Sequence, residues 1–319
     1  MSGSSSPVVR CMVRGRFAPS PTGPLHIGSL VAAVGSFLEV RHHGGEWLVR
    51  IEDVDGPRTR PGAADFILRT LERYALLWDG PVLYQSQRGE MYRAALERLL
   101  DTGLAYPCTC TRRTLAAYPR SSDGSPIYPG HCRHSPDPSA RASAIRLRVN
   151  DQPIVFCDAV QGPYQHILER DIGDFVIRRA DGCFTYQLAV VVDDADQGIS
   201  QVVRGSDLLD STSRQIYLQR LLGLPSLAYA HLPVVVDHTG QKLSKQTGAP
   251  SLDLDQPTPT LWAALDFLGQ APPTDMQRES PETLLAWACA HWRLQRVPTC
   301  LSRPWPSAAL PGNPASRNE

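Results

Sequence analysis

Lysine is almost absent from this sequence of 319 residues. The 32 basic residues comprise 30 arginines and only two lysines, Lys242 and Lys245, which share the single window QKLSKQ. Arginine carries a planar fork of donors, whereas lysine carries a compact charge on a flexible stem. A loop that must deliver a point charge to a moving phosphate would therefore discriminate between them. The alternative, two chance surface lysines, fits this clustering poorly.

Long apolar runs and a net charge are lacking as well. No run approaches the roughly 18–20 residues of a membrane helix, and the opening MSGSSSPVVR has no basic stretch followed by an apolar core. We therefore expect a cytoplasmic protein with no membrane partner. The formal net charge is zero, which argues against a globally basic nucleic-acid-binding protein but allows a local arginine-lined face. The sequence does not decide the oligomeric state, for which a monomer is the expectation.

The chain is long enough for one catalytic body with an insertion. Buried strands and helices follow one another in an order typical of an α/β fold with a doubly wound parallel sheet, as in Rossmann-like domains. The predicted divisions are the first half of a nucleotide-binding domain at 8–103, an insertion at 104–170, the second half at 171–250, a short helical region at 251–303 and a disordered tail at 304–319.

The main elements follow from hydrophobic periodicity and turn residues. Strands are predicted at 8–17, 47–53, 199–205 and 230–236, and helices at 26–42, 63–77, 88–100, 207–222, 261–268 and 281–294. Asp207 is a possible cap of its helix. Within the insertion, the alternating segments ASAIRLRVN and PIVFCD are predicted to pair with each other around residues 150–152.

The stretch RFAPSPTGPLHIGS at 16–29 has the order strand, Pro/Gly turn, helix. That order places backbone N–H groups and the positive end of a helix dipole at the carboxyl edge of a strand, where an anion can sit. The alternative is an ordinary connection with an incidental histidine.

Together, HIGS and KLSKQ resemble the two signature motifs of class I aminoacyl-tRNA synthetases, usually written HIGH and KMSKS. The segments RFAPSPTGPLHIGS, LVRIEDVD, FTYQLAVVVDD and VVRGSDLL resemble the glutamyl-tRNA synthetase group, and the resemblance covers roughly residues 8–250. Ser29 and Gln246 depart from the usual motifs, whereas His26 and Lys245 are in place. The resemblance implies an enzyme that joins the carboxylate of L-glutamate to the α-phosphate of ATP, and ATP chemistry implies Mg²⁺.

Adenylate formation needs positioning and positive charge near the phosphates more than covalent help. The candidate catalytic residues are His26, Lys245 and Lys242, and the candidate ATP contacts are Pro19, Gly23, His26, Gly28, Ser29, Lys242, Ser244 and Lys245. The candidate glutamate contacts are Arg16, Ala18, Ser20, Glu52, Tyr186 and Arg204, of which Ser20, Glu52 and Tyr186 are implied by the resemblance.

Several alternatives stay open for these residues. The two arginines would meet the two substrate carboxylates, in an order that the sequence does not give. Glu52 could hold the substrate ammonium or instead pair with Arg50 or Arg58, and Tyr186 could be a core aromatic.

Three of the eight cysteines cluster. Cys108 and Cys110 form C-x-C, and Cys132 follows 22 residues later, which suits a closed tetrahedral Zn²⁺ site. Residue chemistry alone favours His131 or His134 as the fourth ligand, because imidazole is a commoner zinc donor than phenolate. The stretch also resembles the zinc-binding insertion of glutamyl-queuosine tRNA(Asp) synthetases, which implies Tyr128. Three buried free thiols are the alternative.

Only 73 residues follow Gln246, too few for the anticodon-reading domain of a full glutamyl-tRNA synthetase. The resemblance therefore extends to the shortened glutamyl-queuosine tRNA(Asp) synthetases. It implies tRNA-independent activation of glutamate and transfer to the queuosine at the wobble position of tRNA(Asp). The alternatives are a glutamyl-tRNA synthetase without its reader that charges tRNA(Glu), or a non-catalytic paralogue that binds tRNA or nucleotide.

Overall fold

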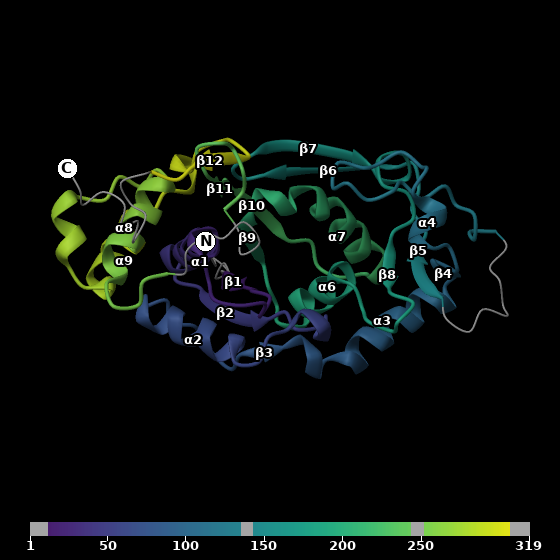
Figure 1. The fold of residues 1–319 in the computed structure, drawn as a ribbon, viewed down its shortest axis with the longest axis horizontal. Coiled ribbons are helices and arrows are strands. Elements are labelled where there is room, and N and C mark those ends of the chain that lie inside the picture. Colours follow the sequence, from purple (N-terminus) through teal and green to yellow (C-terminus); the bar gives the residue numbers. More distant parts are fainter. Residues whose placement is uncertain (1–11, 135–142, 244–251, 307–319) are drawn as a thin grey trace, which may run out of the picture.

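The computed structural model describes residues 12–134, 143–243 and 252–306. The molecule is elongated, with α8 (Pro257–Phe267) and α9 (Pro281–His291) at one end and the insertion at the other (Figure 1). Within these ranges, the helices are all too short or too polar to cross a membrane.

Parallel strands form the centre of the molecule. One ladder has the order β1-β2-β3, and a second pairs β9 with β10, all in parallel. The backbone N–H of Ser200 donates to the carbonyl of Arg14 at 2.9 Å, so β9 begins beside β1. The bounds are β1 (Arg14–Phe17), β2 (Glu46–Ile51), β3 (Leu83–Tyr84), β9 (Gln201–Gly205) and β10 (Ala228–Leu232).

Helix α1 (Ile27–His42) is buried along most of its length because it lies between this sheet and the pair α8 and α9. Gly35 permits the close approach to β10, since a Cβ at that position would lie 2.4 Å from Leu232. Residues of β1, β2, α1, α8 and α9 share one hydrophobic cluster, which includes the fully buried Trp47 and Trp292. The C-terminal helices therefore complete the core of the first half.

A second hydrophobic cluster joins the second half of the nucleotide-binding domain to the insertion. It takes residues from helices α3, α6 and α7 and from strand β5 (Ala144–Leu147), among them Tyr92, Leu147 and Leu188. The remaining helices are α2 (Ala63–Arg73), α3 (Gly89–Asp101), α4 (Arg112–Leu115), α5 (Leu168–Asp171), α6 (Tyr186–Asp196) and α7 (Leu209–Leu222).

The predicted strand pair inside the insertion is wrong. β5 (Ala144–Leu147) lies between β4 (Ala105–Cys108) and β8 (Val176–Arg178), antiparallel to both. β6 (Pro153–Asp158) pairs instead with β7 (Gly162–Ile167), which follows a tight turn. The alternating pattern identified the strands correctly, but it carries no information about which strand is the partner.

Two further expectations differ from the structure near the second motif. Pro233 lacks an N–H and separates the predicted strand at 230–236 into β10 and β11 (Val234–Val236). Asp207 does not cap α7; it lies in a 3₁₀ turn, η3 (Ser206–Leu208), and its carboxylate pairs with Lys242 at 2.6 Å.

The first residues of the predicted disordered tail are ordered. β12 (Ser302–Pro304) pairs in parallel with β11, and the N–H of Trp305 donates to the carbonyl of Val236 at 3.0 Å. The Trp305 side chain is buried against Phe267. Residues 307–319 lie outside the described ranges.

Candidate active site

A cavity of about 520 Å³ opens at the carboxyl ends of β1, β2 and β9, beside the start of α1. Ligands of open parallel sheets bind at this edge. Its walls include the following predicted site residues: Arg16, Ala18, Pro19, Ser20, His26, Gly28, Ser29, Glu52, Tyr186, Arg204 and Lys242. Gly23 is not among the lining residues, and Ser244 and Lys245 lie outside the described part of the chain.

The two motifs meet at this cavity as far as the structure describes them. His26 is the N-cap of α1, and its Nδ1 accepts the N–H of Ser29 at 3.3 Å, which fixes the ring at the start of the helix. Lys242 and Leu243 also line the cavity, and the carbonyl of Leu243 would lie 3.5 Å from a Cβ at Gly28. The first residues of the second motif therefore pack against the helix start that the first motif forms.

Arg16 is held by a partner that the sequence reasoning missed. Its Nε and Nη2 donate to the two carboxylate oxygens of Asp194 at 3.0 and 3.3 Å, and both side chains are buried. Arg50 shares the same carboxylate, with Nη2 at 2.5 Å from Oδ1. Burial alone would lower the pKa of Arg16, but Asp194 outweighs it and raises that pKa. In the sequence, the two acids that end the otherwise apolar run VVVDD could have indicated a buried carboxylate that pairs with an arginine.

Glu52 reaches the cavity from the loop after β2. The arginines that were its alternative partners bind other carboxylates, because Arg50 pairs with Asp194 and Arg58 pairs with Asp55. Burial raises the pKa of Glu52 to about 7, against the opposing effect of Arg50 and Arg16. The site therefore contains a buried acid whose ionised form is costly, as expected of a group that receives a cationic ligand.

Tyr186 and Arg204 also line the cavity and contact each other. The Nη1 group of Arg204 donates to the hydroxyl of Tyr186 at 2.9 Å. Tyr186 is the first residue of α6 and Arg204 comes from β9, so the contact links a helix start to a strand end. Burial raises the pKa of Tyr186, and the hydroxyl stays protonated and able to donate. Tyr186 is therefore a wall of the cavity rather than only a core aromatic.

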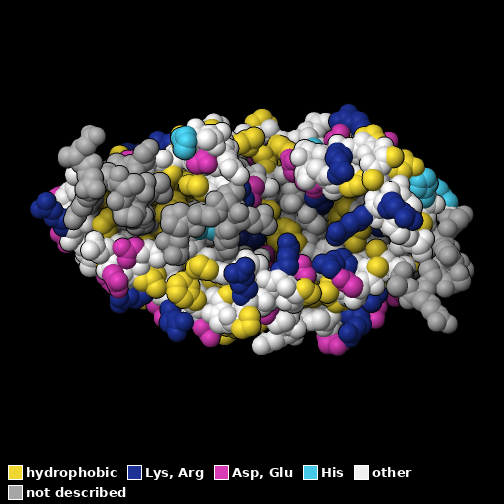
Figure 2. Space-filling model, in the orientation of Figure 1, with side chains coloured by type: hydrophobic (Ala, Val, Ile, Leu, Met, Phe, Trp, Pro, Cys, Tyr) yellow, Lys and Arg dark blue, Asp and Glu magenta, His cyan; other side chains and the backbone are white. Residues whose placement is uncertain are grey.

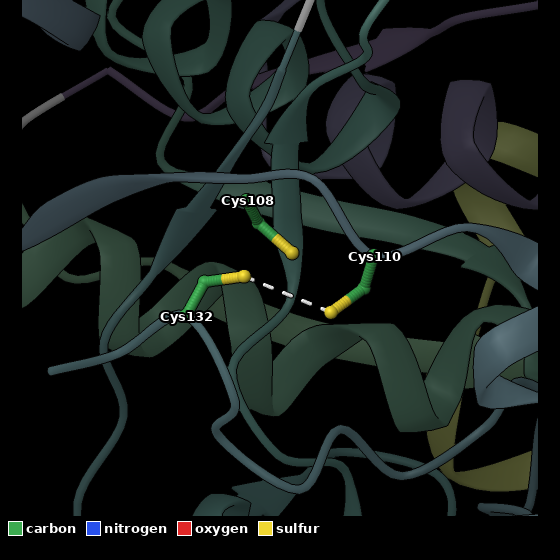
Figure 3. Close-up of side chains that lie close together, drawn as sticks. All are labelled: Cys108, Cys110 and Cys132. Atoms are coloured by element: carbon green, nitrogen blue, oxygen red, sulfur yellow. Dashed lines mark hydrogen bonds between the residues drawn. The ribbon is translucent and has the colours of Figure 1, made fainter. Parts of the chain in front are cut away.

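The predicted thiol cluster forms in the insertion (Figure 3). Cys110 and Cys132 have their sulfurs 3.7 Å apart, and the Tyr128 hydroxyl oxygen lies 3.4 Å from the Cys108 sulfur and 3.7 Å from the Cys110 sulfur. A tetrahedral zinc site with Zn–S of about 2.3 Å and Zn–O of about 2.0 Å has S···S edges of about 3.8 Å and S···O edges of about 3.5 Å. The donor spacing therefore fits one tetrahedral metal ion.

Among the described Cys, His, Asp and Glu residues, the group of ligand atoms within 4.8 Å of one another contains the three cysteines and neither His131 nor His134. His131 Nε2 is 2.7 Å from the hydroxyl of Tyr118, whereas the hydroxyl of Tyr128 lies beside two of the three sulfurs. Burial and the hydrogen bond from Cys108 raise the pKa of the Tyr128 hydroxyl, and the N–H of Cys132, which donates to the same oxygen at 2.8 Å, opposes this effect in part. Burial raises the pKa of Cys110 to about 11. For Cys132, the hydrogen bonds from Tyr128 and Thr109 outweigh burial and lower its pKa to about 7.

A buried arginine completes the surroundings of the cluster. Arg146 donates from Nε to the sulfur of Cys108 at 3.2 Å, and its guanidinium carbon lies 3.8 Å from the ring centre of Tyr128. Its Nη1 also donates to the carbonyl of Asp174 at 2.7 Å. Three thiolates would carry more negative charge than one divalent cation neutralises, and this arginine offsets part of the excess.

The fold and this geometry have clear relatives. A family model described as the catalytic domain of class I tRNA synthetases (E and Q) matches residues 12–262. The chain is 56% identical over 285 residues to a glutamyl-Q tRNA(Asp) synthetase of Thiobacillus denitrificans, covering 89% of this chain and 95% of the relative. It is 57% identical over 287 residues to that of Dechloromonas aromatica, again covering 89% and 95%. For the relative in Aromatoleum aromaticum the identity is 54% over 305 residues, covering 95% and 96%.

Solved structures give the same picture of the fold. The chain resembles a glutamate tRNA ligase of Elizabethkingia meningosepticum in complex with its amino acid, with a TM-score of 0.77 and 25% identity, over 93% of this chain and 68% of that one. For the glutamate-tRNA synthetase of Elizabethkingia anophelis the TM-score is 0.78 at 24% identity, and the match covers 94% of this chain and 69% of that one. The longer chains therefore contain this fold and additional residues.

Proposed function

Because this chain belongs to the class I tRNA synthetases, and within them to the glutamyl-Q tRNA(Asp) synthetases, we propose that its central cavity activates L-glutamate with ATP. The glutamyl group is then transferred to the queuosine of tRNA(Asp). The predicted family, fold class and ligase activity are thereby confirmed. Roles of individual residues and of the metal site are part of the proposal.

One observation carries the proposal for the chemistry. The described parts of both motifs line a single cavity that also contains two arginines and the carboxylates of Glu52 and Asp207, of which Asp207 pairs with Lys242. In this cavity a carboxylate oxygen of glutamate attacks the α-phosphorus of ATP, the bond to the β-phosphate breaks, and pyrophosphate leaves with Mg²⁺. His26 and the N–H groups at the start of α1 face the triphosphate. We assign Lys242 to the same phosphates, and the role of Lys245 stays a prediction.

The amino acid is recognised by three charges. Arg16 and Arg204 both supply positive charge to the cavity, and each keeps at least one N–H group that its described partners do not use. Glu52 accepts the substrate ammonium, which favours the ionised form that burial makes costly. We propose Ala18 and Ser20 as backbone and hydroxyl contacts beside them, on the turn after β1.

Transfer requires the hydroxyl of the queuosine cyclopentene-diol to attack the acyl carbonyl of the adenylate, with AMP as the leaving group. A wobble base in an anticodon loop can be unstacked and enter a pocket. On the face drawn in Figure 2, many Lys and Arg side chains lie on the half of the molecule that carries the insertion, although the chain has no net charge. These side chains suit phosphate contacts that position an RNA.

The insertion would hold one structural Zn²⁺ through Cys108, Cys110, Tyr128 and Cys132. The distances among these donors support this assignment. A closed four-ligand site stabilises the fold and leaves no coordination position for substrate. We propose that the metal fixes the loop at 109–132 against the sheet of β4, β5 and β8. Cytoplasmic location and a monomeric state stay predictions.

The test supplies the purified protein with ATP, Mg²⁺ and radiolabelled glutamate, and with queuosine-bearing tRNA(Asp), queuosine-free tRNA(Asp) or tRNA(Glu). We expect pyrophosphate exchange without any tRNA, and stable label only on the queuosine-bearing tRNA(Asp). Queuosine-free tRNA(Asp) is the matched control, because it keeps the 3′-terminal diol and lacks only the cyclopentene-diol. Label on tRNA(Glu), or label that does not depend on queuosine, would contradict the proposal.

A further inference from the structure

The buried side of Arg204 is attached to two side chains that do not line the cavity. Arg204 Nε donates to Nε2 of His231 at 3.1 Å, and Nδ1 of His231 lies 2.6 Å from Oδ2 of Asp158. The side chains of His231 and Asp158 have no exposed surface. Buried polar groups of this kind are costly unless they are fully paired.

The protonation state of His231 follows from its partners. A guanidinium can only donate, so Nε2 of His231 accepts from Arg204 and the ring proton is on Nδ1, which donates to Asp158. Burial lowers the pKa of His231 despite its hydrogen bond to Asp158, in agreement with a neutral ring. Asp158 therefore selects the tautomer that can receive Arg204.

The Asp158 carboxylate is itself fixed by backbone groups. Its Oδ1 accepts the N–H of Val160 at 3.0 Å, of Gln161 at 2.9 Å and of His231 at 3.0 Å. Asp158 is the last residue of β6, in the insertion, whereas His231 lies on β10 of the central sheet. The insertion therefore contributes a side chain to the support of the glutamate pocket.

The other edge of Arg204 is held as well. Its Nη2 donates to Thr212 Oγ1 at 2.8 Å and lies 3.4 Å from the carbonyl of Leu208, while Nη1 donates to Tyr186 at 2.9 Å. Of the five guanidinium N–H groups, four thus have partners among the described residues and one on Nη1 does not. The supports fix the plane of the guanidinium and leave one N–H of Nη1 for a ligand.

We propose that Asp158 and His231 are positioning residues for glutamate recognition, which act through Arg204. The inference rests on the proposed function of the cavity. If the acceptor at His231 Nε2 is lost, the guanidinium can turn about its stem, and a displacement of about 1 Å in such a contact costs up to about 100-fold. The phosphate-binding side of the cavity, at the start of α1, does not involve this chain of hydrogen bonds.

The experiment measures pyrophosphate exchange in the full-length protein for His231→Leu, Asp158→Asn and His231→Gln. We expect the KM for glutamate to rise about 10- to 100-fold in the first two variants, with the KM for ATP within about twofold of wild type. His231→Gln can offer Oε1 to Arg204 and should recover most of the loss. Tyr229→Phe is the matched control, because it keeps the ring stacked on His231 and loses only its hydrogen bonds with Gln219.

A second pair of variants covers the case in which His231→Leu and Asp158→Asn do not fold. The Thr212 hydroxyl accepts from Arg204 and also lies 3.1 Å from Nε2 of His231. Thr212→Ser keeps this hydroxyl and Thr212→Val removes it from both partners, so only the valine variant should raise the KM for glutamate. Equal increases in the two KM values, or an unchanged KM for glutamate in folded His231→Leu or Thr212→Val, would overturn the inference. A wild-type protein without glutamate-dependent exchange would instead refute the proposed function.

Discussion

Replacement of Glu52 by glutamine should stabilise the protein and weaken its substrate binding at the same time. The pKa of this carboxyl rises from 4.5 in the unfolded chain to about 7 in the folded protein. A group with a raised pKa binds its proton more tightly in the folded state, so its ionisation destabilises the fold as the pH rises from below 4.5 to above 7. At 1.36 kcal/mol per unit, the cost reaches up to about 3 kcal/mol at pH 8.

Glutamine has nearly the same shape and cannot ionise. Urea unfolding at pH 8 should therefore give Glu52→Gln a free energy of unfolding up to about 3 kcal/mol higher than wild type, and a difference close to zero at pH 4.5. Glu90→Gln, an exposed carboxylate on α3, serves as the control and should show no such pH-dependent gain. A Glu52→Gln variant equally destabilised at both pH values would refute the reasoning.

Substrate binding supplies the second half of this prediction. The ammonium of glutamate requires the ionised form of Glu52, so the KM for glutamate in the wild type should fall about tenfold as the pH rises from 6 to 8 through the pKa of about 7. In Glu52→Gln the KM should be about 10- to 100-fold higher, the loss of one charge-assisted contact, and nearly independent of pH. A glutamine variant that keeps the wild-type KM and pH profile would exclude Glu52 from the glutamate pocket.

Three further predictions concern other parts of the site. Lys245→Ala should abolish pyrophosphate exchange while circular dichroism and melting stay unchanged, and exchange at the wild-type rate would defeat its proposed role. Elemental analysis should find one zinc per chain in the wild type and none in Cys110→Ser, whereas Cys157→Ser, at an exposed isolated thiol, should keep it; a folded and active wild type without metal would rule the site out. Asp194→Asn leaves two buried arginines short of countercharge and should lower the free energy of unfolding by about 3–5 kcal/mol, so a variant as stable as wild type in urea would contradict that assignment.

Local patterns predicted the elements well. The hydrophobic run after the PSPTGP turn begins its helix at Ile27, one residue after the predicted start, and the helix ends at His42 as expected. The periodicity of buried side chains depends on the local backbone, so a single segment carries the information. Which strands pair with each other is not determined by the local backbone of either strand. The segments of β5 and β6 were therefore predicted to pair with each other, whereas in the structure each has other partners.

The sequence by itself determined the family resemblance, the order of the motifs and the residue types of the cavity and the thiol cluster, because each of these is written within short stretches of chain. Only the tertiary structure decided what holds those residues. Asp194 reaches Arg16 across 178 positions, and Asp158 reaches His231 across 73. Contacts at such separations depend on how sheets and helices pack, and the buried charges they pair have no periodicity that a sequence could display.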